Sequence, residues 1–365
     1  MSNRFIDLAA PGLAALKPYV PGKPLSELER ELGIRDSIKL ASNENPLGPS
    51  PAVMRAIEAE LGNLTRYPDG GAYALRSALA KRHGVEPAGI TVGNGSNDVL
   101  DMIARAFLWS GRESLFSQYA FAVYPISSMA VGATTVVAPA KDYGHDLQAL
   151  RDRVSDRTGV VWIANPNNPT GTLLTEAALR EFVASLPSSV MCVVDEAYFE
   201  YVQHGDYPDT SRWLGEFDNL IVTRTFSKAY GLAALRVGYG VSHPDVADLL
   251  NRVRQPFNVD SLAQAAALAA LNDVDYLQRS VEVNQRGLRQ LVEGVERLGL
   301  DYIPSHGNFL TIDTGREAAP LDRALLQQGV ITRPIANYGL PNHLRVTVGV
   351  EAENARFLDA LGRVL

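Results

Sequence analysis

The segment Val190–Tyr198 reads VMCVVDEAY, an apolar run that ends in two acids and a tyrosine. An uninterrupted apolar run of this length is typical of a strand that is covered on both faces of a parallel sheet. Asp195 then lies at the carboxyl end of the strand, the edge at which open α/β sheets bind their ligands. Because a buried carboxylate is costly without a partner, the segment predicts a parallel sheet with a functional edge.

Further short apolar runs lie on both sides of this one, separated by longer segments with helical periodicity. We expect strands at 90–92, 114–116, 135–137, 160–163, 190–194 and 220–222. Apolar residues recur at three- and four-residue steps in 98–107 and 177–186, which predicts helices that cover the sheet. This alternation predicts the α/β class, with a mainly parallel sheet between layers of helices.

The pattern changes after residue 260. We expect an Ala- and Leu-rich helix from Ser261 and a long helix near 276–298, followed by strands at 308–312, 330–333 and 344–348. This order predicts a smaller α+β domain. The first residues of the chain are rich in Pro and Gly and are expected to form an arm. We therefore divide the chain into an arm with part of the small domain (1–45), a large domain (46–260) and a small C-terminal domain (261–365).

The composition is that of a globular enzyme and excludes several kinds of partner. Hydrophobic residues make up 46% and charged residues 21% of the 365 residues. A net charge of −7 argues against nucleic acid or an anionic membrane as a partner. No basic start with an apolar stretch resembles a signal peptide, and no apolar segment approaches the roughly 20 residues of a membrane span. We expect a cytoplasmic protein that binds small molecules.

Neither the single cysteine nor the histidines indicate a metal site or a disulfide. Cys192 lies inside the apolar run and is expected to be a small core residue. The six histidines are scattered without HExxH or paired ligand spacing, so no metal is expected; they are residues 83, 145, 204, 243, 306 and 343.

The segment Val92–Asn97 reads VGNGSN and is the first candidate ligand site. A strand meets a helix here, and free amides at a helix start favour a phosphate. Gly95, Ser96 and Asn97 are the candidate contacts. A plain strand-to-helix turn explains the pattern equally well, because the segment lacks the ending of a P-loop and the third glycine of a dinucleotide fingerprint.

A second candidate, Asn165–Gly171, reads NPNNPTG and directly follows the run at 160–163. Asn, Pro and Gly are common in turns, so a simple loop is one interpretation. The other is that Asn168, fixed between prolines at the carboxyl end of a strand, is a rigid hydrogen-bond donor to a ligand.

Two more candidate residues follow apolar runs. Asp195 comes directly after the run 190–194, and Lys228 lies shortly after the run 220–222. Asp195 is either a helix-capping residue or the partner of a protonated pyridine nitrogen, with Tyr198 within reach of the phenolic oxygen of the same ring. Lys228 ends the segment Thr223–Lys228, which reads TRTFSK, and precedes a small apolar stretch. Desolvation there lowers the pKa of a lysine and prepares it for Schiff-base chemistry, although most lysines are simply solvated. Thr225, Ser227 and Arg236 suit a phosphate dianion.

In this order and spacing, the motifs NPTG (168–171), DEAY (195–198) and SK (227–228) resemble the fold type I pyridoxal-phosphate aminotransferases. The resemblance extends over nearly the whole chain and is closest to members that act on histidinol phosphate. It includes LKPYVPGK (16–23), LASNENPLG (40–48), RYPDG (66–70) and LRVTVG (344–349). The resemblance implies a large domain with a seven-stranded sheet that binds pyridoxal 5'-phosphate, and a small α+β domain.

The resemblance also implies a role for each matching residue. Lys228 would be the Schiff-base lysine and the base that moves the proton, Asp195 would pair with the pyridinium nitrogen, and Phe121 would stack on the ring unless it is an ordinary core aromatic. Asn168 and Tyr198 would bind the phenolate oxygen. The cofactor phosphate would be held by Gly95, Ser96, Asn97, Thr225, Ser227 and Arg236, with Tyr67 reaching it across a homodimer interface. Tyr67 is otherwise a turn residue before Pro68.

For the substrate, the resemblance implies that Arg345 grips an α-carboxylate and that Tyr19 and Arg333 lie near a substrate phosphate. A planar guanidinium suits a carboxylate better than an ammonium does. The implied reaction is amino transfer from L-histidinol phosphate to 2-oxoglutarate, giving imidazole acetol phosphate and L-glutamate. The alternatives are an aromatic amino-acid aminotransferase, a pyridoxal-phosphate decarboxylase of a phosphorylated amino acid and a non-catalytic ligand sensor. The sensor has little support, because no helix-turn-helix or basic segment precedes the domain.

Overall fold

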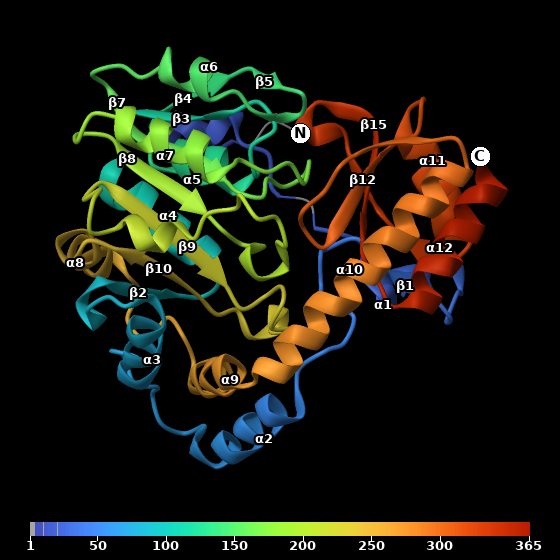
Figure 1. The fold of residues 1–365 in the computed structure, drawn as a ribbon, viewed down its shortest axis with the longest axis horizontal. Helices are drawn as coiled ribbons and strands as arrows, with labels where there is room; N and C mark the ends of the chain where they lie inside the picture. Colours follow the sequence, from blue (N-terminus) through green and yellow to red (C-terminus); the bar gives the residue numbers. More distant parts are fainter. Residues whose placement is uncertain (1–3, 10, 20) are drawn as a thin grey trace.

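The computed structural model describes residues 4–9, 11–19 and 21–365. Two lobes are visible in Figure 1, a large lobe built around a seven-stranded sheet and a small lobe built around a four-stranded sheet. The long helix α10 (Val274–Arg297) runs from beside α9 (Ser261–Asn272) to the small lobe. The expected helices after residue 260 are thus confirmed.

The sheet of the large lobe confirms the predicted α/β class. Its strand order is β2-β10-β9-β8-β7-β3-β4, and only β10 runs antiparallel to its neighbours. The bounds in that order are Ile90–Gly93, Gly238–Ser242, Leu220–Thr225, Met191–Asp195, Thr158–Ala164, Glu113–Ser117 and Thr134–Ala138. Six of the strands overlap predicted runs. The seventh strand, β10, matches no predicted run, because its two glycines interrupt its apolar character.

Alternate residues of the central strands enter two separate hydrophobic cores, one on each face of the sheet. Val161 and Ile163 of β7 belong to the first core, while Val160 and Trp162 belong to the second. The first is covered by α3 (Tyr73–His83), α6 (Leu147–Arg151), α7 (Glu176–Ser185) and α9. The second is covered by α4 (Ser96–Phe107), α5 (Val123–Ala130) and α8 (Pro244–Val253). Cys192 lies in the first core, as expected.

The register of the parallel strands brings their carboxyl ends to one edge. Asp195 at the end of β8 stands opposite Ala164 of β7 and Thr223 of β9. The loop that begins at Asn165 and the segment that leads to Lys228 therefore start from neighbouring points of the sheet.

The small lobe holds an antiparallel sheet of order β11-β12-β15-β14. Its strands are Asp301–Ile303, Phe309–Asp313, Leu340–Thr347 and Arg333–Ile335, covered by α11 (Ala318–Gln327) and α12 (Glu351–Val364). The strand predicted at 330–333 is divided between β13 (Val330–Ile331) and β14.

The N-terminal part of the chain is joined to the small lobe. β1 (Ile38–Lys39) pairs in parallel with β13, and α1 (Leu25–Leu32) lies beside the C-terminal elements in Figure 1. The chain then crosses to the large lobe, where α2 (Pro51–Glu60) packs against α9. Later in the large lobe, β5 (Ala140–Lys141) and β6 (Gly144–His145) form a two-stranded hairpin. Residues 41–48 are thus a crossing between the lobes, and this places them beside the functional edge of the sheet.

Among the residues that the structure describes, none of the helices combines the length and the apolar character that a membrane span requires. Within the same residues, no three His, Cys, Asp or Glu side chains are grouped so that they could hold a metal ion.

Candidate active site

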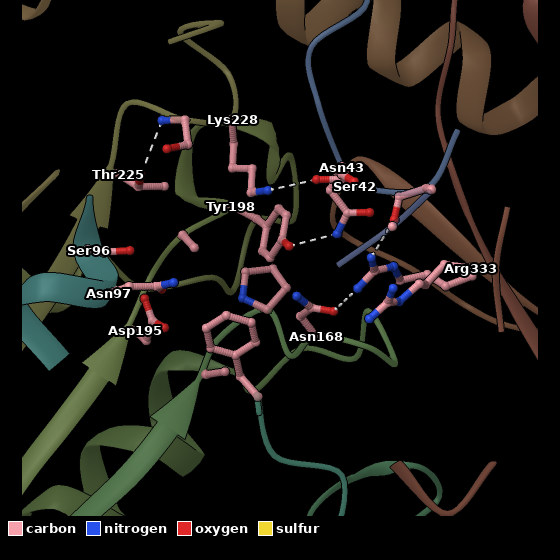
Figure 2. Close-up of a pocket in the computed structure, with 18 of the residues that line it drawn as sticks. Ser42, Asn43, Ser96, Asn97, Asn168, Asp195, Tyr198, Thr225, Lys228 and Arg333 are labelled. Atoms are coloured by element: carbon pink, nitrogen blue, oxygen red, sulfur yellow. Dashed lines mark hydrogen bonds between the residues drawn. The ribbon is translucent and has the colours of Figure 1, made fainter. Parts of the chain in front are cut away.

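A cavity lies at the carboxyl ends of β7, β8 and β9, and residues 41–43 and β15 enclose its other side (Figure 2). It gathers nearly all of the predicted site residues. Those that line it are Tyr19, Ser96, Asn97, Phe121, Asn168, Asp195, Tyr198, Thr225, Ser227, Lys228, Arg236, Arg333 and Arg345. Gly95 directly precedes Ser96 of this lining, and Tyr67 does not line the cavity.

Asp195 is buried and held from two sides. Its Oδ1 accepts a hydrogen bond of 2.9 Å from the hydroxyl of Thr223, and its Oδ2 accepts one of 2.9 Å from the hydroxyl of Tyr124. Burial raises the pKa of Asp195 to about 6, while the two hydrogen bonds and the charge of Lys228 act in the opposite direction. The next helical turn, Phe199–Tyr201, has Tyr198 and not Asp195 as its N-cap, so the helix-capping alternative is wrong. A nearby cation would lower the pKa and keep the carboxylate ionised.

Lys228 lies in the loop that follows β9. Its Nζ donates a hydrogen bond of 3.1 Å to the carbonyl oxygen of Ser42 and lies 5.9 Å from the ring centroid of Tyr198. Burial lowers the pKa of Lys228 to about 7, with a further contribution from the positive charge of Arg345. A substantial fraction of this amine is therefore neutral at neutral pH, as a nucleophile or a general base requires.

Tyr198 and Asn168 lie on the side of the cavity that faces the small lobe (Figure 2). The hydroxyl of Tyr198 accepts a hydrogen bond of 2.8 Å from Nδ2 of Asn43, and its ring packs edge-on against Phe309 at 5.3 Å. Burial raises the pKa of Tyr198 to about 12, so the phenol keeps its proton and remains a donor. Oδ1 of Asn168 accepts a hydrogen bond from Arg345.

The start of α4, two hydroxyls and a guanidinium form an anion cradle. Gly95 precedes Ser96, the first residue of the helix, with φ of 79°. A Cβ at position 95 would overlap Nη2 of Arg236, so only glycine allows the guanidinium so close to the helix start. Nη1 of Arg236 donates to the hydroxyl of Ser227 at 3.3 Å, and the hydroxyl of Thr225 accepts from the backbone N–H of Ser227. Helix dipole and guanidinium both favour an anion here.

Arg345 and Arg333 bring positive charge to the opposite side. Arg345 is buried, and its guanidinium donates to Oδ1 of Asn168 and to the carbonyl oxygen of Ala41. Its Nε is buried without a hydrogen-bond partner among the described residues, so the guanidinium keeps unused donor capacity for a ligand. Arg333 stands opposite Arg345 on β14, with its guanidinium carbon 5.7 Å from the ring centroid of Tyr19. The predicted substrate residues are therefore adjacent.

Phe121 lines the cavity just before α5 and contacts the ring of Tyr124 edge-on at 5.8 Å. Tyr67, by contrast, is 81% exposed and stacks on Phe257 at a centroid distance of 4.6 Å. Within one chain, Tyr67 does not reach the cavity, so its predicted contact requires a second copy.

Thr223, Tyr124 and Asn43 bond to Asp195 or Tyr198 but have no role predicted from the sequence. Thr223 lies two residues before Thr225 on β9, a spacing that puts both on one face of a strand. Tyr124 follows Phe121 by about one helical turn at the start of α5. This spacing places both side chains on one side of the helix and could have identified Tyr124 from the sequence. Asn43 has no local signal, because its partners lie far away in the sequence.

A buried ion cluster supports the edge of the sheet beneath the cavity. Nε and Nη2 of Arg224 donate to Oε2 of Glu196 at 2.9 and 2.7 Å, and Nη2 also donates to Asp209 at 2.6 Å. The hydroxyl of Thr210 donates to the other carboxylate oxygen of Glu196. Since Glu196 and Arg224 adjoin Asp195, Thr223 and Thr225, the cluster fixes the ends of β8 and β9 that carry the site.

Comparisons with known proteins place these residues in context. The family described as aminotransferase class I and II matches residues 35–361. The chain is 59% identical to histidinol-phosphate aminotransferase 2 of Pseudomonas fluorescens, covering 100% of this chain and 99% of the relative. It is 55% identical to histidinol-phosphate aminotransferase 2 of Pseudomonas aeruginosa, covering 99% and 98%. The crystal structure of histidinol-phosphate aminotransferase from Sinorhizobium meliloti in complex with pyridoxal-5'-phosphate superposes with a TM-score of 0.89 at 30% identity, covering 100% and 98%.

Proposed function

Because this chain belongs to the aminotransferase class I and II family, we propose that it is a pyridoxal-phosphate-dependent histidinol-phosphate aminotransferase. The reaction transfers the amino group of L-histidinol phosphate to 2-oxoglutarate and gives imidazole acetol phosphate and L-glutamate, a step of histidine biosynthesis. The observation that carries the proposal is the placement of Lys228, with its pKa lowered to about 7, in one cavity with Asp195 and an anion cradle.

The residues of the cavity fit the chemical groups of pyridoxal 5'-phosphate. The cradle of Gly95, Ser96, Asn97, Thr225, Ser227 and Arg236 suits its phosphate, while the carboxylate of Asp195 suits its ring nitrogen. Asn168 and Tyr198 would bind its phenolate oxygen, Phe121 would stack on the ring, and Lys228 would hold it through Nζ. When bound, this cofactor supplies an electron sink that stabilises negative charge on the α-carbon of the substrate.

The chain's own residues would then set charges and move a proton. Asp195 receives hydrogen bonds on both oxygens, so it can keep its negative charge beside a protonated ring nitrogen. Lys228 would act as the base, because its lowered pKa leaves a neutral amine at neutral pH. The protonated hydroxyl of Tyr198 would donate to an anionic oxygen.

Arg345 and Arg333 would each bind a different anionic group of the substrates. The guanidinium of Arg345, whose Nε has no hydrogen-bond partner among the described residues, would bind the α-carboxylate of glutamate or 2-oxoglutarate. Arg333 and Tyr19 would lie near the phosphate of L-histidinol phosphate, since they adjoin Arg345 at the outer side of the same cavity.

We also propose that the enzyme is a cytoplasmic homodimer whose chain is divided into an arm and two domains. A homodimer would bring the exposed Tyr67 of one copy to the phosphate cradle of the other. The enzyme would work in the cytoplasm. The N-terminal arm with part of the small domain would span 1–45, the large domain 46–260 and the small domain 261–365, with the pairing of β1 and β13 as support.

Substrate choice and attachment test this function directly. We expect kcat/KM to be higher for L-histidinol phosphate than for phenylalanine or tyrosine, with 2-oxoglutarate as acceptor. A preference for the aromatic amino acids would overturn the named substrate, and release of carbon dioxide would indicate a decarboxylase. Borohydride reduction followed by peptide mapping should label Lys228. Lys228→Ala should lose turnover and label, whereas Lys141→Ala, at an exposed position of β5, should keep both.

A further inference from the structure

Asn43 is a buried junction between the two lobes, in the segment that crosses from one to the other. It is 1% exposed, and its backbone has φ of 55°, in the left-handed region that asparagine tolerates better than most residues. Its side-chain Nδ2 donates a hydrogen bond of 2.8 Å to the hydroxyl of Tyr198 in the large lobe.

Two residues of the small lobe hold Asn43 in this conformation. Its backbone N–H donates to the hydroxyl of Thr347 at 2.9 Å, and its carbonyl oxygen accepts from Nδ2 of Asn308 at 3.0 Å. The hydroxyl of Thr347 also lies 3.3 Å from Oδ1 of Asn43, to which it donates. This contact assigns the oxygen end of the amide to Thr347 and the nitrogen end to Tyr198.

Thr347 belongs to the same strand as a predicted substrate residue. It follows Arg345 by two residues on β15, so the two side chains lie on one face of the strand. Arg345 contacts the carbonyl oxygen of Ala41, and Thr347 contacts Asn43, two residues further along the crossing segment. The residue between them, Ser42, accepts the hydrogen bond from Lys228. The crossing segment thus contacts Lys228 and Tyr198 from one side and the small lobe from the other.

The direction of the hydrogen bond from Asn43 determines where the proton of Tyr198 is free to point. A phenol has one proton to donate and lone pairs that accept. Because the hydroxyl oxygen of Tyr198 accepts from Asn43, its own proton is not used in that contact. The proton is left for a group inside the cavity, which both residues line.

We propose that Asn43 is a positioning residue of the active site: its amide directs the hydroxyl proton of Tyr198 into the cavity, and Thr347 and Asn308 of the small lobe hold that amide in place. The inference rests on the proposed function, in which Tyr198 donates to the phenolate oxygen of the cofactor. It adds a residue whose role would be exerted through Tyr198, by setting the direction in which that hydroxyl donates.

The test measures the pH at which the visible absorption of the bound cofactor changes, in Asn43→Asp, Tyr198→Phe and the double variant. A carboxylate at position 43 can only accept, so it would capture the proton of Tyr198 and remove the donor from the phenolate oxygen. That oxygen then keeps more negative charge. The charge would raise the pKa of the protonated nitrogen through which Lys228 holds the cofactor. We expect the pH midpoint to rise by about one unit in both single variants and no further in the double variant.

Two more variants separate hydrogen-bond direction from charge and stability. Asn45→Asp introduces the same charge two residues away, at a side chain that bonds to Ala229 and Ser280 and does not contact Tyr198. It should lower the melting temperature without moving the midpoint. Asn43→Gly keeps the left-handed backbone and removes the amide, so the midpoint should rise by a smaller amount. Should Asn43→Asp not fold, this glycine variant supplies the test.

The outcomes are distinguishable. A midpoint in Asn43→Asp and Asn43→Gly equal to that of the unsubstituted enzyme, with a shift in Tyr198→Phe, would overturn the inference. Fully additive shifts in the double variant would do the same, because they would mean that the new charge acts without Tyr198. If the unsubstituted enzyme takes up no pyridoxal 5'-phosphate, it is the proposed function that fails.

Discussion

The hydroxyl of Tyr124 donates a hydrogen bond of 2.9 Å to Oδ2 of Asp195, and both side chains are buried. The ring of Tyr124 stacks on Trp162 at a centroid distance of 5.1 Å and an angle of 11°. Nε1 of Trp162 in turn donates to the hydroxyl of Ser114. The orientation of Asp195 is therefore fixed by a chain of contacts that leads from the cavity into the core of the large lobe.

Removing the Tyr124 hydroxyl should weaken the cofactor site more than the fold. In Tyr124→Phe, Asp195 loses a donor that lowers its pKa, so the pKa should rise above its value of about 6. The loss of affinity for pyridoxal 5'-phosphate at acidic pH should then begin at a higher pH, with a decrease on the order of tenfold near neutrality. Equilibrium binding from pH 5 to 8 measures this, with Tyr143→Phe, outside the cavity, as control. An unchanged pH profile would contradict the role of Tyr124.

The rate of cofactor loading should increase as the pH rises through about 7. The pKa of Lys228 is lowered to about 7 by burial and by Arg345, so the neutral amine that attaches the cofactor gains population across that range and is complete above it. Arg345→Gln removes one cause of the lowering and should move the midpoint to higher pH. Stopped-flow absorbance of the enzyme mixed with cofactor gives both curves. A rate that does not change between pH 6 and 8 would exclude this pKa for Lys228.

Replacing Arg345 by lysine should impair the carboxylate-bearing substrates. The planar guanidinium reaches Asn168, the carbonyl oxygen of Ala41 and the cavity at once, and an ammonium cannot reproduce that geometry. We expect KM for 2-oxoglutarate and glutamate to increase by about 10- to 100-fold, which corresponds to the loss of a charge-assisted hydrogen bond. Steady-state kinetics with Arg363→Lys, at an exposed position of α12, as the control checks this result. Equal KM values in the two variants would argue against carboxylate binding by Arg345.

A hybrid dimer tests whether Tyr67 acts across an interface. Lys228→Ala and Tyr67→Ala should each be impaired alone. In a mixed dimer, one site would combine Lys228 of one chain with Tyr67 of the other, so random reassociation of equal amounts should restore up to about a quarter of full activity. The measurement is activity after mixing, unfolding and refolding the two variants together. If mixing restores nothing although both variants refold into dimers, Tyr67 does not serve the neighbouring site.

The buried ion cluster should be important for stability. Arg224→Met would leave Glu196 charged, fully buried and without its guanidinium partner, which should cost about 3–5 kcal/mol of unfolding free energy. Arg212 also pairs with Asp209 but is 81% exposed, so Arg212→Met should change stability by less than about 1 kcal/mol. Chemical denaturation of the two variants compares them. Equal losses would mean that burial does not decide the contribution of these ion pairs.

Much of the fold and of the site could be predicted from the sequence, because the information is local. Five apolar residues before Asp195 predict a central strand, and the same pattern holds for β7 and β9. The polar residues that follow such strands meet at one edge, and the structure brings Asn168, Asp195, Thr225 and Lys228 together there. The strand β10 cannot be predicted in this way, since its glycines remove the apolar signal that identifies the others.

Only the tertiary structure decided how these residues are oriented and coupled. The sequence places Tyr198 three residues after Asp195, yet the direction of its hydroxyl depends on Asn43, 155 residues away along the chain. The ionisation of Lys228 depends on burial and on Arg345, and that of Asp195 depends on burial, Tyr124 and Thr223. Local pattern determines which segments become buried strands, because hydrophobic burial depends mainly on side-chain type and period. Hydrogen bonds and charges depend on distance in space, and folding alone sets those distances.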